Sequence, residues 1–396
     1  MPLGEVPSAS AEYRPAGLLC PFDLDVSTIG CLLNAELADD PVYDGFEVQS
    51  YDDDVHGRGL LVFLSRRETR MVDYYVTPGL EVDRDRFVLG AGTGGWYEAH
   101  FEAARLVVDE QGVDLDVAFS DVDGRRIELQ VNDRDGSARR RGTLLAPVGS
   151  GIDEPASLLL VWLHGFDLVH DTGAEPIIRI DGRQASTGSL PGSRLHNRHL
   201  IKMAAPLTTV AVNLSIDGPA PIVLGVVGRT GAGEPSAVDR ADAAGDGTVT
   251  PPGPRFHLDE TGAVAEVVAT TNAGGRARLA LRPGVPDLRA IHDGEQLQGR
   301  WRVDIDGTPG VTGGSWQVRR DGEQVVCDLE VTRRWKPGRQ PPLMMAVTTL
   351  VPVFSRWPTT YRWLAVVTLG DQPTIRSGWQ RTAAARGGGY RRLTSS

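Results

Sequence analysis

The chain has 396 residues, a formal net charge of −11 and a pI near 5.3. Because one hydrophobic core stops growing at roughly 250 to 300 residues, this length predicts two domains. The content of 41% hydrophobic and 23% charged residues supports a sizeable core and excludes wholesale disorder. A negative net charge repels phosphate groups, so we expect neither a nucleic acid nor a membrane surface as a partner.

The cysteines and the first residues of the chain indicate a reducing compartment. Cys20, Cys31 and Cys327 show no C-x-x-C spacing, which argues against a disulfide framework and against a zinc site. Residues 1–5 lack the basic start of a secretory signal, and no apolar run reaches the roughly 18 residues of a membrane helix. We therefore predict a cytoplasmic protein, and we predict neither a bound metal nor a cofactor.

The glycine and proline content predicts a turn-rich β fold. The chain has 47 glycines and 26 prolines, and both residue types interrupt helices. Between residues 228 and 254 no hydrophobic period survives, and the two ends of the chain are equally unpatterned. The predicted parts are a disordered N-terminus (1–15), an N-terminal β domain (16–227), a Gly/Ala/Pro-rich linker (228–254), a C-terminal β domain (255–382) and a disordered tail (383–396).

Three consecutive carboxylates, Asp52, Asp53 and Asp54, are the earliest candidates for acid–base chemistry. A pair of carboxyl groups can exchange protons with a substrate. These three residues lie in a polar turn, where aspartate usually serves the turn and stays hydrated. Both interpretations remain open, and hydration is the commoner one.

The next motif is glycine-rich and runs from Gly90 to Gly95, after the short apolar run Phe87-Val88-Leu89. It matches G-x-G-x-x-G and resembles a dinucleotide-binding fingerprint. The resemblance implies that Gly90, Gly92 and Gly95 admit a pyrophosphate at a helix N-terminus and that Asp121 binds a ribose. The alternative interpretation is a glycine-rich β-turn, which the hairpin patterns downstream favour.

The segment that follows, 96–110, carries two periods at once. Ala99, Ala103 and Leu106 keep helical spacing, while Tyr97, Ala99 and Ala103 fit the alternation of a strand. Helix and strand therefore both remain open here. The next residues are clearer, because apolar and polar residues alternate over 113–119, which is typical of a half-buried strand.

A hairpin is the clearest local prediction. The turn signal Asp123-Gly124 separates the alternating run 113–119 from a second one over 127–132. Other apolar runs fit buried strands, and they cover 158–163, 210–216, 222–227 and 363–369. Together these patterns predict strands that pair with their neighbours in sequence.

Histidine and aspartate gather after the apolar run 158–163. His164, Asp167 and His170 lie close together, and His196 and His199 follow. Their spacing lacks an H-E-x-x-H pattern, so no metal site is predicted. His164, Asp167 and His170 are kept as candidates for general acid–base catalysis. No G-x-S-x-G elbow occurs, so the sequence does not indicate a serine nucleophile.

The C-terminal unit is dense in aromatic side chains. Gly299-Arg300-Trp301 and Gly314-Ser315-Trp316 share a G-x-W spacing that resembles the opening of lipocalin-type barrels. Aromatic residues in such a barrel can line a ligand cavity. The alternative interpretation is ordinary core packing by large side chains. The candidate ligand-binding residues are Trp301, Trp316, Trp357, Tyr361 and Trp363.

The sequence as a whole predicts an all-β protein with two antiparallel β-barrel or sandwich units, lipocalin-like barrels among them, and few short helices. We expect it to bind a small apolar molecule in a barrel pocket or an inter-domain cleft, or to convert one without a cofactor by isomerisation or hydration. One alternative is a nucleotide-dependent oxidoreductase that uses the loop from Gly90 to Gly95. Another is a non-enzymatic interaction module with an exposed apolar patch.

Overall fold

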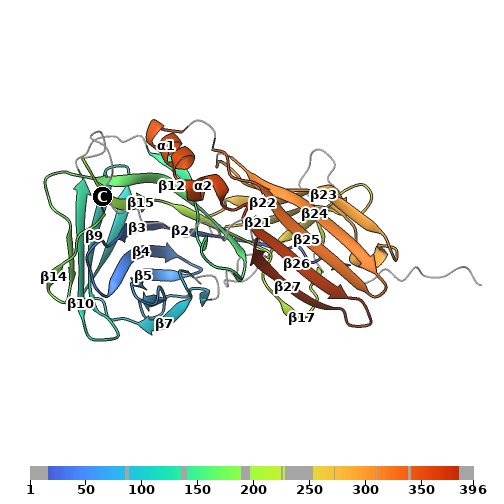
Figure 1. Cartoon of the computed structure of the whole chain (residues 1–396), viewed down its shortest axis with the longest axis horizontal. Coiled ribbons are helices and arrows are strands. Elements are labelled where there is room, and N and C mark those ends of the chain that lie inside the picture. The colour runs from blue at the N-terminus through green and yellow to red at the C-terminus, as the bar shows by residue number, and fades with distance from the viewer. Residues whose placement is uncertain are drawn as a thin grey trace, which may run out of the picture.

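The computed structural model of the chain is almost entirely β, as the sequence predicts (Figure 1). The residues that the structure describes are 17–84, 89–134, 141–188, 197–223, 226–227, 253–271, 273–308, 310–337 and 340–382. The predicted disordered ends lie outside these residues, and so does nearly all of the predicted linker.

Ten strands form the first sheet. Their spatial order is β2 (Leu24–Ile29), β16 (Leu207–Val212), β12 (Leu158–His170), β15 (Arg198–Ala204), β3 (Cys31–Glu36), β4 (Tyr43–Asp53), β5 (Gly57–Arg66), β6 (Val72–Val76) and β7 (Thr93–Glu98), with β11 (Gly142–Ala146) beside β12. Neighbours are antiparallel except β6 and β7, which run parallel. The first half of β12 pairs with β16 and its second half with β15, so β12 joins two wings of the sheet.

Five strands form a second sheet, in the order β14 (Arg183–Gln184), β13 (Ile177–Ile180), β10 (Arg126–Arg134), β9 (Gly112–Ser120) and β8 (Ala103–Asp109). The predicted hairpin is confirmed, because β9 pairs with β10 and places Phe119 opposite Ile127 and Val117 opposite Leu129. The open question over 96–110 is settled as well, since this segment contains the end of β7 and the whole of β8.

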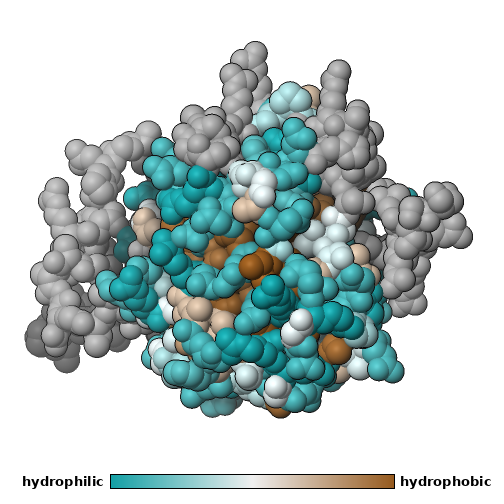
Figure 2. Space-filling view, turned by 90° about the vertical axis from the view of Figure 1, so that its left-hand side faces the viewer, coloured by the Kyte–Doolittle hydropathy of each residue, from teal (hydrophilic) through white to brown (hydrophobic). Residues whose placement is uncertain are grey.

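The five-stranded sheet packs against the wing of the first sheet that holds β3 to β6. Leu33, Val48 and Val62 of that wing meet Leu115 and Leu129 of the five-stranded sheet, and each of the five is at most 2% exposed. Alternation places these residues on one face of each strand. Figure 2 looks onto this end of the molecule, where hydrophilic residues surround a smaller hydrophobic area.

A second ten-stranded sheet forms the C-terminal part. Its order is β17 (Asp217–Pro219), β27 (Thr374–Arg381), β26 (Tyr361–Thr368), β25 (Gln324–Arg333), β24 (Thr312–Asp321), β23 (Gln296–Ile305), β22 (Arg276–Val285), β21 (Val264–Thr270), β20 (Arg255–Leu258) and β19 (Val226–Val227). Strands β20 to β27 follow one another as an antiparallel meander. The remaining elements are the pair β1 (Leu18–Leu19) and β18 (Ile222–Val223), a 3-10 turn (Leu288–Ala290), α1 (Pro342–Leu350) and α2 (Pro352–Arg356).

The chain reaches the C-terminal sheet before the predicted linker. Strand β17 pairs with β27 at one edge of that sheet, and β19 pairs with β20 at the other edge. Both strands fall inside the range predicted for the N-terminal domain, 16–227. The C-terminal sheet is therefore built from residues on both sides of the linker.

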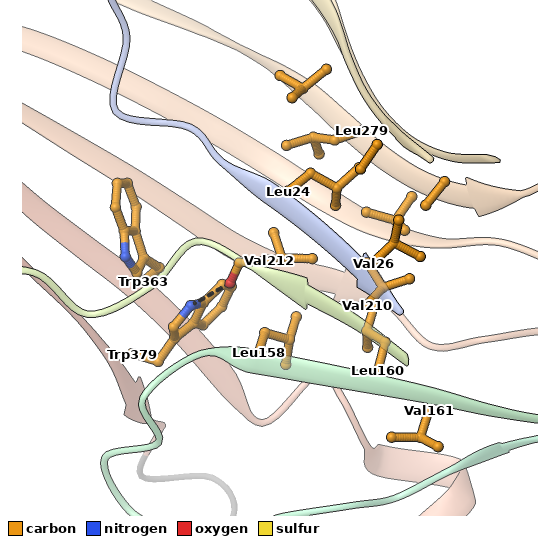
Figure 3. Close-up of a cluster of buried hydrophobic side chains, with 14 of the residues drawn as sticks. Leu24, Val26, Leu158, Leu160, Val161, Val210, Val212, Leu279, Trp363 and Trp379 are labelled. Carbon is orange, nitrogen blue, oxygen red and sulfur yellow. Dashed lines mark hydrogen bonds between the residues drawn. The ribbon is translucent and has the colours of Figure 1, made fainter. Parts of the chain in front are cut away.

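One hydrophobic core joins the C-terminal sheet to the wing of β2, β16 and β12 (Figure 3). The buried side chains drawn there include Leu24, Val26, Leu158, Leu160, Val210, Val212, Leu279, Trp363 and Trp379. The Trp379 indole Nε1 also donates hydrogen bonds to the carbonyl oxygens of Val212 (3.0 Å) and Asn213 (2.8 Å). At this junction, where the sequence predicts an inter-domain cleft, these side chains pack together, and a pocket of about 330 Å³ remains beside Phe22, Ile216 and Phe256.

The repeated G-x-W spacing has a cross-strand explanation. Trp301 of β23 stands opposite Gly314 of β24, and Trp316 of β24 stands opposite Gly299 of β23. A Cβ atom on Gly299 would lie 2.6 Å from the Trp316 ring and 2.5 Å from the carbonyl oxygen of Arg282. Gly299 therefore gives the Trp316 indole the room that it occupies, whereas a Cβ atom on Gly314 would meet the Glu330 carbonyl oxygen of β25.

The shared core predicts one cooperative unfolding transition for the described parts of both units. Leu279→Ala removes a fully buried side chain from the C-terminal side of this core, and should lower the free energy of unfolding by about 2 to 5 kcal/mol. Urea unfolding followed by circular dichroism and by tryptophan fluorescence should give coincident curves for this variant. Val366→Ala, at a side chain 37% exposed, is the control and should change stability by about 0.5 kcal/mol or less. Two separate transitions would contradict a common core.

The close contact between Gly299 and Trp316 predicts that one added methyl group lowers the stability of the protein. Gly299→Ala should destabilise the protein by about 1 to 3 kcal/mol, because the ring of Trp316 and the β22 backbone must move apart. Gly378→Ala in β27 is the matched control, since its Cβ would lie 3.6 Å from Ser215 Oγ, an ordinary contact. Equal melting temperatures for the two variants would refute the packing explanation.

Candidate functional site

One face of β4 is unusually polar for a strand in the middle of a sheet. Glu47, Gln49, Tyr51 and Asp53 are alternate residues, so their side chains share this face. The opposite face of β4 carries apolar residues such as Val48, which pack in the sandwich with the five-stranded sheet. The polar face of β4 is turned away from that sandwich.

Glu47 belongs to a row of side chains that crosses six neighbouring strands. Register places Lys202 opposite Asn34, Asn34 opposite Glu47, Glu47 opposite Phe63, Phe63 opposite Tyr74, and Tyr74 opposite Trp96. Directly opposed residues lie on the same face of a sheet. We call these six residues, Lys202, Asn34, Glu47, Phe63, Tyr74 and Trp96, the transverse row.

The polar half of the transverse row holds the Glu47 carboxyl group from two sides. Gln49 Nε2 donates a hydrogen bond to Glu47 Oε1 (2.6 Å), and Asn34 Nδ2 donates one to Glu47 Oε2 (3.2 Å). Lys202 Nζ donates to Asn34 Oδ1 (3.3 Å), and the Tyr51 hydroxyl donates to Gln49 Oε1 (2.8 Å). Both carboxyl oxygens are thus oriented by amides that are themselves held in place.

The environment of Glu47 changes its proton affinity. Burial raises the pKa of Glu47, and although the hydrogen bonds from Gln49 and Asn34 and the charge of Lys202 lower it, burial prevails. A raised pKa makes the ionised carboxyl group a stronger base than an exposed glutamate. Among the side chains of the transverse row, Glu47 is therefore the one suited to acid–base chemistry.

The other half of the transverse row is aromatic. Phe63 and Tyr74 meet edge to face with ring centroids 5.1 Å apart, and Tyr74 stacks on Trp96 at 4.3 Å. Phe63 and Tyr74 are buried, whereas Trp96 is half-buried and has the Arg84 guanidinium 5.5 Å from its ring centroid. The row thus joins a half-buried carboxyl group to two buried aromatic rings, and the half-buried Trp96 is the aromatic member that solvent reaches.

The sequence-predicted ligand residues lie elsewhere, in the shared core. Trp301, Trp316, Trp357, Tyr361 and Trp363 are each between 1% and 4% exposed. Trp357 and Tyr361 line a cavity of about 30 Å³, which has room for little more than a water molecule. The Tyr361 hydroxyl donates to the carbonyl oxygens of Gly149 (2.7 Å) and Ile152 (2.8 Å). At these positions the geometry is that of core packing, the alternative interpretation of the sequence.

The candidate acid–base residues on β12 have structural partners. His164 Nε2 lies 3.1 Å from Thr208 Oγ1, and burial lowers the pKa of His164. His170 Nε2 lies 3.5 Å from Asp167 Oδ2, and the His170 backbone N–H donates to Asp133 Oδ2 at 2.7 Å. His164 and the Asp167–His170 pair are thus engaged in separate interactions. His196 lies outside the described residues.

The glycine-rich motif forms a turn between strands. The Gly92 N–H donates to the Leu89 carbonyl oxygen (3.0 Å), and Gly90 and Gly92 have φ values of +62° and +124° that suit glycine. Residues 93–98 continue as β7, so the helix N-terminus that a pyrophosphate site uses is not formed by this segment. Gly95 lies within β7.

Asp121, the predicted ribose ligand, closes the hairpin of β9 and β10. Its Oδ2 accepts hydrogen bonds from the Tyr43 hydroxyl (2.7 Å) and from Arg125 Nε (2.7 Å). Its Oδ1 accepts the backbone N–H groups of Asp123 (2.9 Å) and Arg125 (2.8 Å). The carboxylate therefore ties this turn to β4, which is a structural role.

The cysteines are buried and free. Burial raises the pKa of Cys20 to about 12 and that of Cys31 to about 11. Burial raises the pKa of Cys327 as well, and its side chain is fully buried in β25. Thiols that stay protonated are poor nucleophiles.

The described residues offer neither a metal cluster nor a membrane-spanning helix. Among them, no group of three or more histidine, cysteine, aspartate or glutamate side chains is placed to hold a metal ion. In the same part of the chain, no helix has the length and apolarity needed to cross a bilayer.

Comparison with known proteins finds no matching family model, no matching curated protein and no matching solved structure.

The raised pKa of Glu47 predicts a pH-dependent stability. Between the usual glutamate pKa of about 4.3 and the native value, the folded state binds more protons than the unfolded state, so stability falls as pH rises. Glu47→Gln keeps an acceptor oxygen but cannot ionise, and should remove this fall. Urea unfolding from pH 4 to pH 8 measures how the free energy of unfolding changes with pH. Glu36→Gln, at a side chain 62% exposed, should keep the wild-type profile, and the same profile for Glu47→Gln would contradict the assignment.

Proposed function

We propose that the protein binds a small, largely apolar molecule over the transverse row and converts it without a cofactor, by proton transfer of the isomerisation or hydration type. The observation that carries this proposal is the Glu47 carboxyl group, which is half-buried, held at both oxygens and raised in pKa. Proton transfer by a positioned carboxyl group contributes about 10² to 10⁴ in rate.

The neighbours of Glu47 have complementary roles in this proposal. Asn34 and Gln49 hold the Glu47 carboxyl group in one plane. The oxygen lone pairs that accept the proton therefore point in a fixed direction. Lys202 stabilises the ionised form through its positive charge, which lets Glu47 return to the carboxylate after each proton transfer. These three residues act on the carboxyl group as positioning residues.

The aromatic half of the row explains why the molecule bound here is apolar. Phe63 stands directly opposite Glu47, and the buried Tyr74 stacks on Trp96, whose half-buried ring is the part of the row open to a ligand. Aromatic rings of this kind contribute large contact areas to a planar or hydrocarbon ligand. The proposal thus retains the substrate class expected from the sequence and moves its site from the C-terminal aromatic residues to the N-terminal sheet.

The two alternatives to this proposal have different support. The nucleotide-dependent oxidoreductase depended on a helix after Gly95, and the strand β7 occupies that position. The interaction module depends on an exposed apolar patch, for which the hydrophobic area in Figure 2 is a candidate. Neither alternative uses the hydrogen-bonded carboxyl group of Glu47.

A test of the proposal uses 5-nitrobenzisoxazole, a planar apolar probe whose ring opens when a base removes its C3 proton. The C–H and N–O bonds break, and the coloured nitrophenolate is released. The protein should catalyse this reaction, with a rate that rises with pH as Glu47 ionises and with an apparent pKa above about 4.3. Glu47→Gln should lower kcat/KM by about 10²-fold or more.

Two further variants sharpen this test. Glu36→Gln removes an exposed carboxylate beside Lys202 and should leave the rate unchanged. Trp96→Ala should raise KM more than it lowers kcat, because it removes contact area and not the base. A Glu47→Gln variant that is folded and as active as the wild type would contradict the role of Glu47. A wild-type rate no higher than that of free acetate would contradict the conversion itself.

A further inference from the structure

A second constellation lies at the far end of the polar face of β4. Asp53 is the last residue of β4, and His56 ends the turn that leads to β5. His56 Nδ1 lies 3.0 Å from Asp53 Oδ2 and 3.1 Å from Asp53 Oδ1, and His56 Nε2 lies 3.3 Å from Ser27 Oγ on β2. A carboxylate, an imidazole and a hydroxyl thus follow one another at hydrogen-bond distances.

The bend at Gly30 brings Ser27 to this place. Strands β2 and β3 are consecutive, but β3 pairs with β4 whereas β2 leaves it to pair with β16. A Cβ atom on Gly30 would lie 2.9 Å from the Ser50 carbonyl oxygen, so the chain passes close to β4 as it turns. Ser27 alternates with Val26, which faces the shared core, and its side chain is therefore directed to the opposite side, toward His56.

Asp53 holds the imidazole in one orientation. Its Oδ1 accepts the backbone N–H groups of Val55 and His56 at 2.9 Å each. Burial raises the pKa of Asp53, but the hydrogen bonds from His56 and Val55 outweigh it and the pKa lies below its usual value. An ionised carboxylate accepts a hydrogen bond from Nδ1–H, and this tautomer leaves the lone pair of Nε2 for the serine hydroxyl.

The group of Ser27, His56 and Asp53 packs against the protein on one side and is exposed to solvent on the other. The His56 ring packs against the Tyr51 ring at 5.1 Å, which limits its rotation. The side chains of His56 and Asp53 are 15% and 22% exposed, and Ser27 is half-buried. The Glu81 backbone N–H donates to the His56 carbonyl oxygen (2.8 Å), and Arg58 lies 3.6 Å from Asp52 in the same hairpin. A small molecule from solvent can therefore reach the hydroxyl.

We infer that Ser27, His56 and Asp53 form a nucleophilic site that hydrolyses a small ester, an activity separate from proton transfer at Glu47. Nucleophile, base and orienting carboxylate are recognised by their geometry and not by their order in the chain. The chain order here is Ser27, Asp53, His56.

The reaction proceeds in two balanced steps. Ser27 Oγ forms a bond to the ester carbonyl carbon while its proton moves to His56 Nε2, and the C–O bond to the leaving alcohol breaks as the alcohol takes that proton. Water then attacks the acyl-Ser27 ester and gives its proton to His56. The carboxylic acid is released, and the Ser27 hydroxyl recovers its proton from His56.

The test uses a fluorophosphonate probe, which bonds to an activated serine oxygen with loss of fluoride. Incubation of the full chain followed by peptide mass spectrometry should place the label on Ser27. Ser27→Ala should lose that label, and Ser65→Ala, which removes a serine of β5, should keep it. Asp53→Asn preserves an acceptor for the turn but favours the wrong imidazole tautomer, so labelling should slow about tenfold or more.

Further outcomes separate this site from the one at Glu47. Glu47→Gln should be labelled at the wild-type rate, so a failed proton-transfer assay leaves the labelling result intact. p-Nitrophenyl acetate hydrolysis should fall in Ser27→Ala and Asp53→Asn while circular dichroism and melting curves match those of the wild type. Absence of label on Ser27, or equal labelling rates for the wild type and Asp53→Asn, would overturn the assignment.

Discussion

The structure depends on strands that are apolar where two sheets meet. Strands β2, β16 and β12 place Leu24, Val210 and Leu160 against the inner side of the C-terminal meander, where they are fully or almost fully buried. Burial of such side chains contributes about 1.5 to 3 kcal/mol each. This contact explains why the C-terminal tryptophans are buried. It also leaves the other wing of the first sheet, with β4 in its middle, free to present polar groups.

Local patterns were sufficient to predict the strands, because alternation and turn residues act over a few positions. The run 113–119 and the turn Asp123-Gly124 therefore led directly to the observed hairpin of β9 and β10. The role of Trp363 required knowledge of what packs on it, and the nearby side chains come from β2 and β16, more than a hundred residues away in sequence. Sequence alone could therefore not distinguish a lined cavity from a filled core.

Local sequence patterns could not predict the candidate site, for a similar reason. Glu47, Gln49 and Tyr51 alternate in the sequence, but alternating polar residues usually indicate a face exposed to solvent. Their meaning comes from register, which places Asn34 and Lys202 beside the carboxyl group. Asp53 was noted as a hydrated turn residue, which agrees with its hydrogen bonds to backbone N–H groups. Its contact with a histidine ring follows from the conformation of the turn, which the residue types do not reveal.

The distance along the chain between β2 and its partners has a consequence for biosynthesis. Residues 24–29 are made long before their neighbour β16, which ends at Val212, and before the strands that cover them, which extend to Arg381. During most of translation, this apolar strand has no native partner to pack against. Contacts of such long range form slowly, and the exposed segment is prone to aggregate. The nascent chain should therefore depend on chaperones until its synthesis is complete.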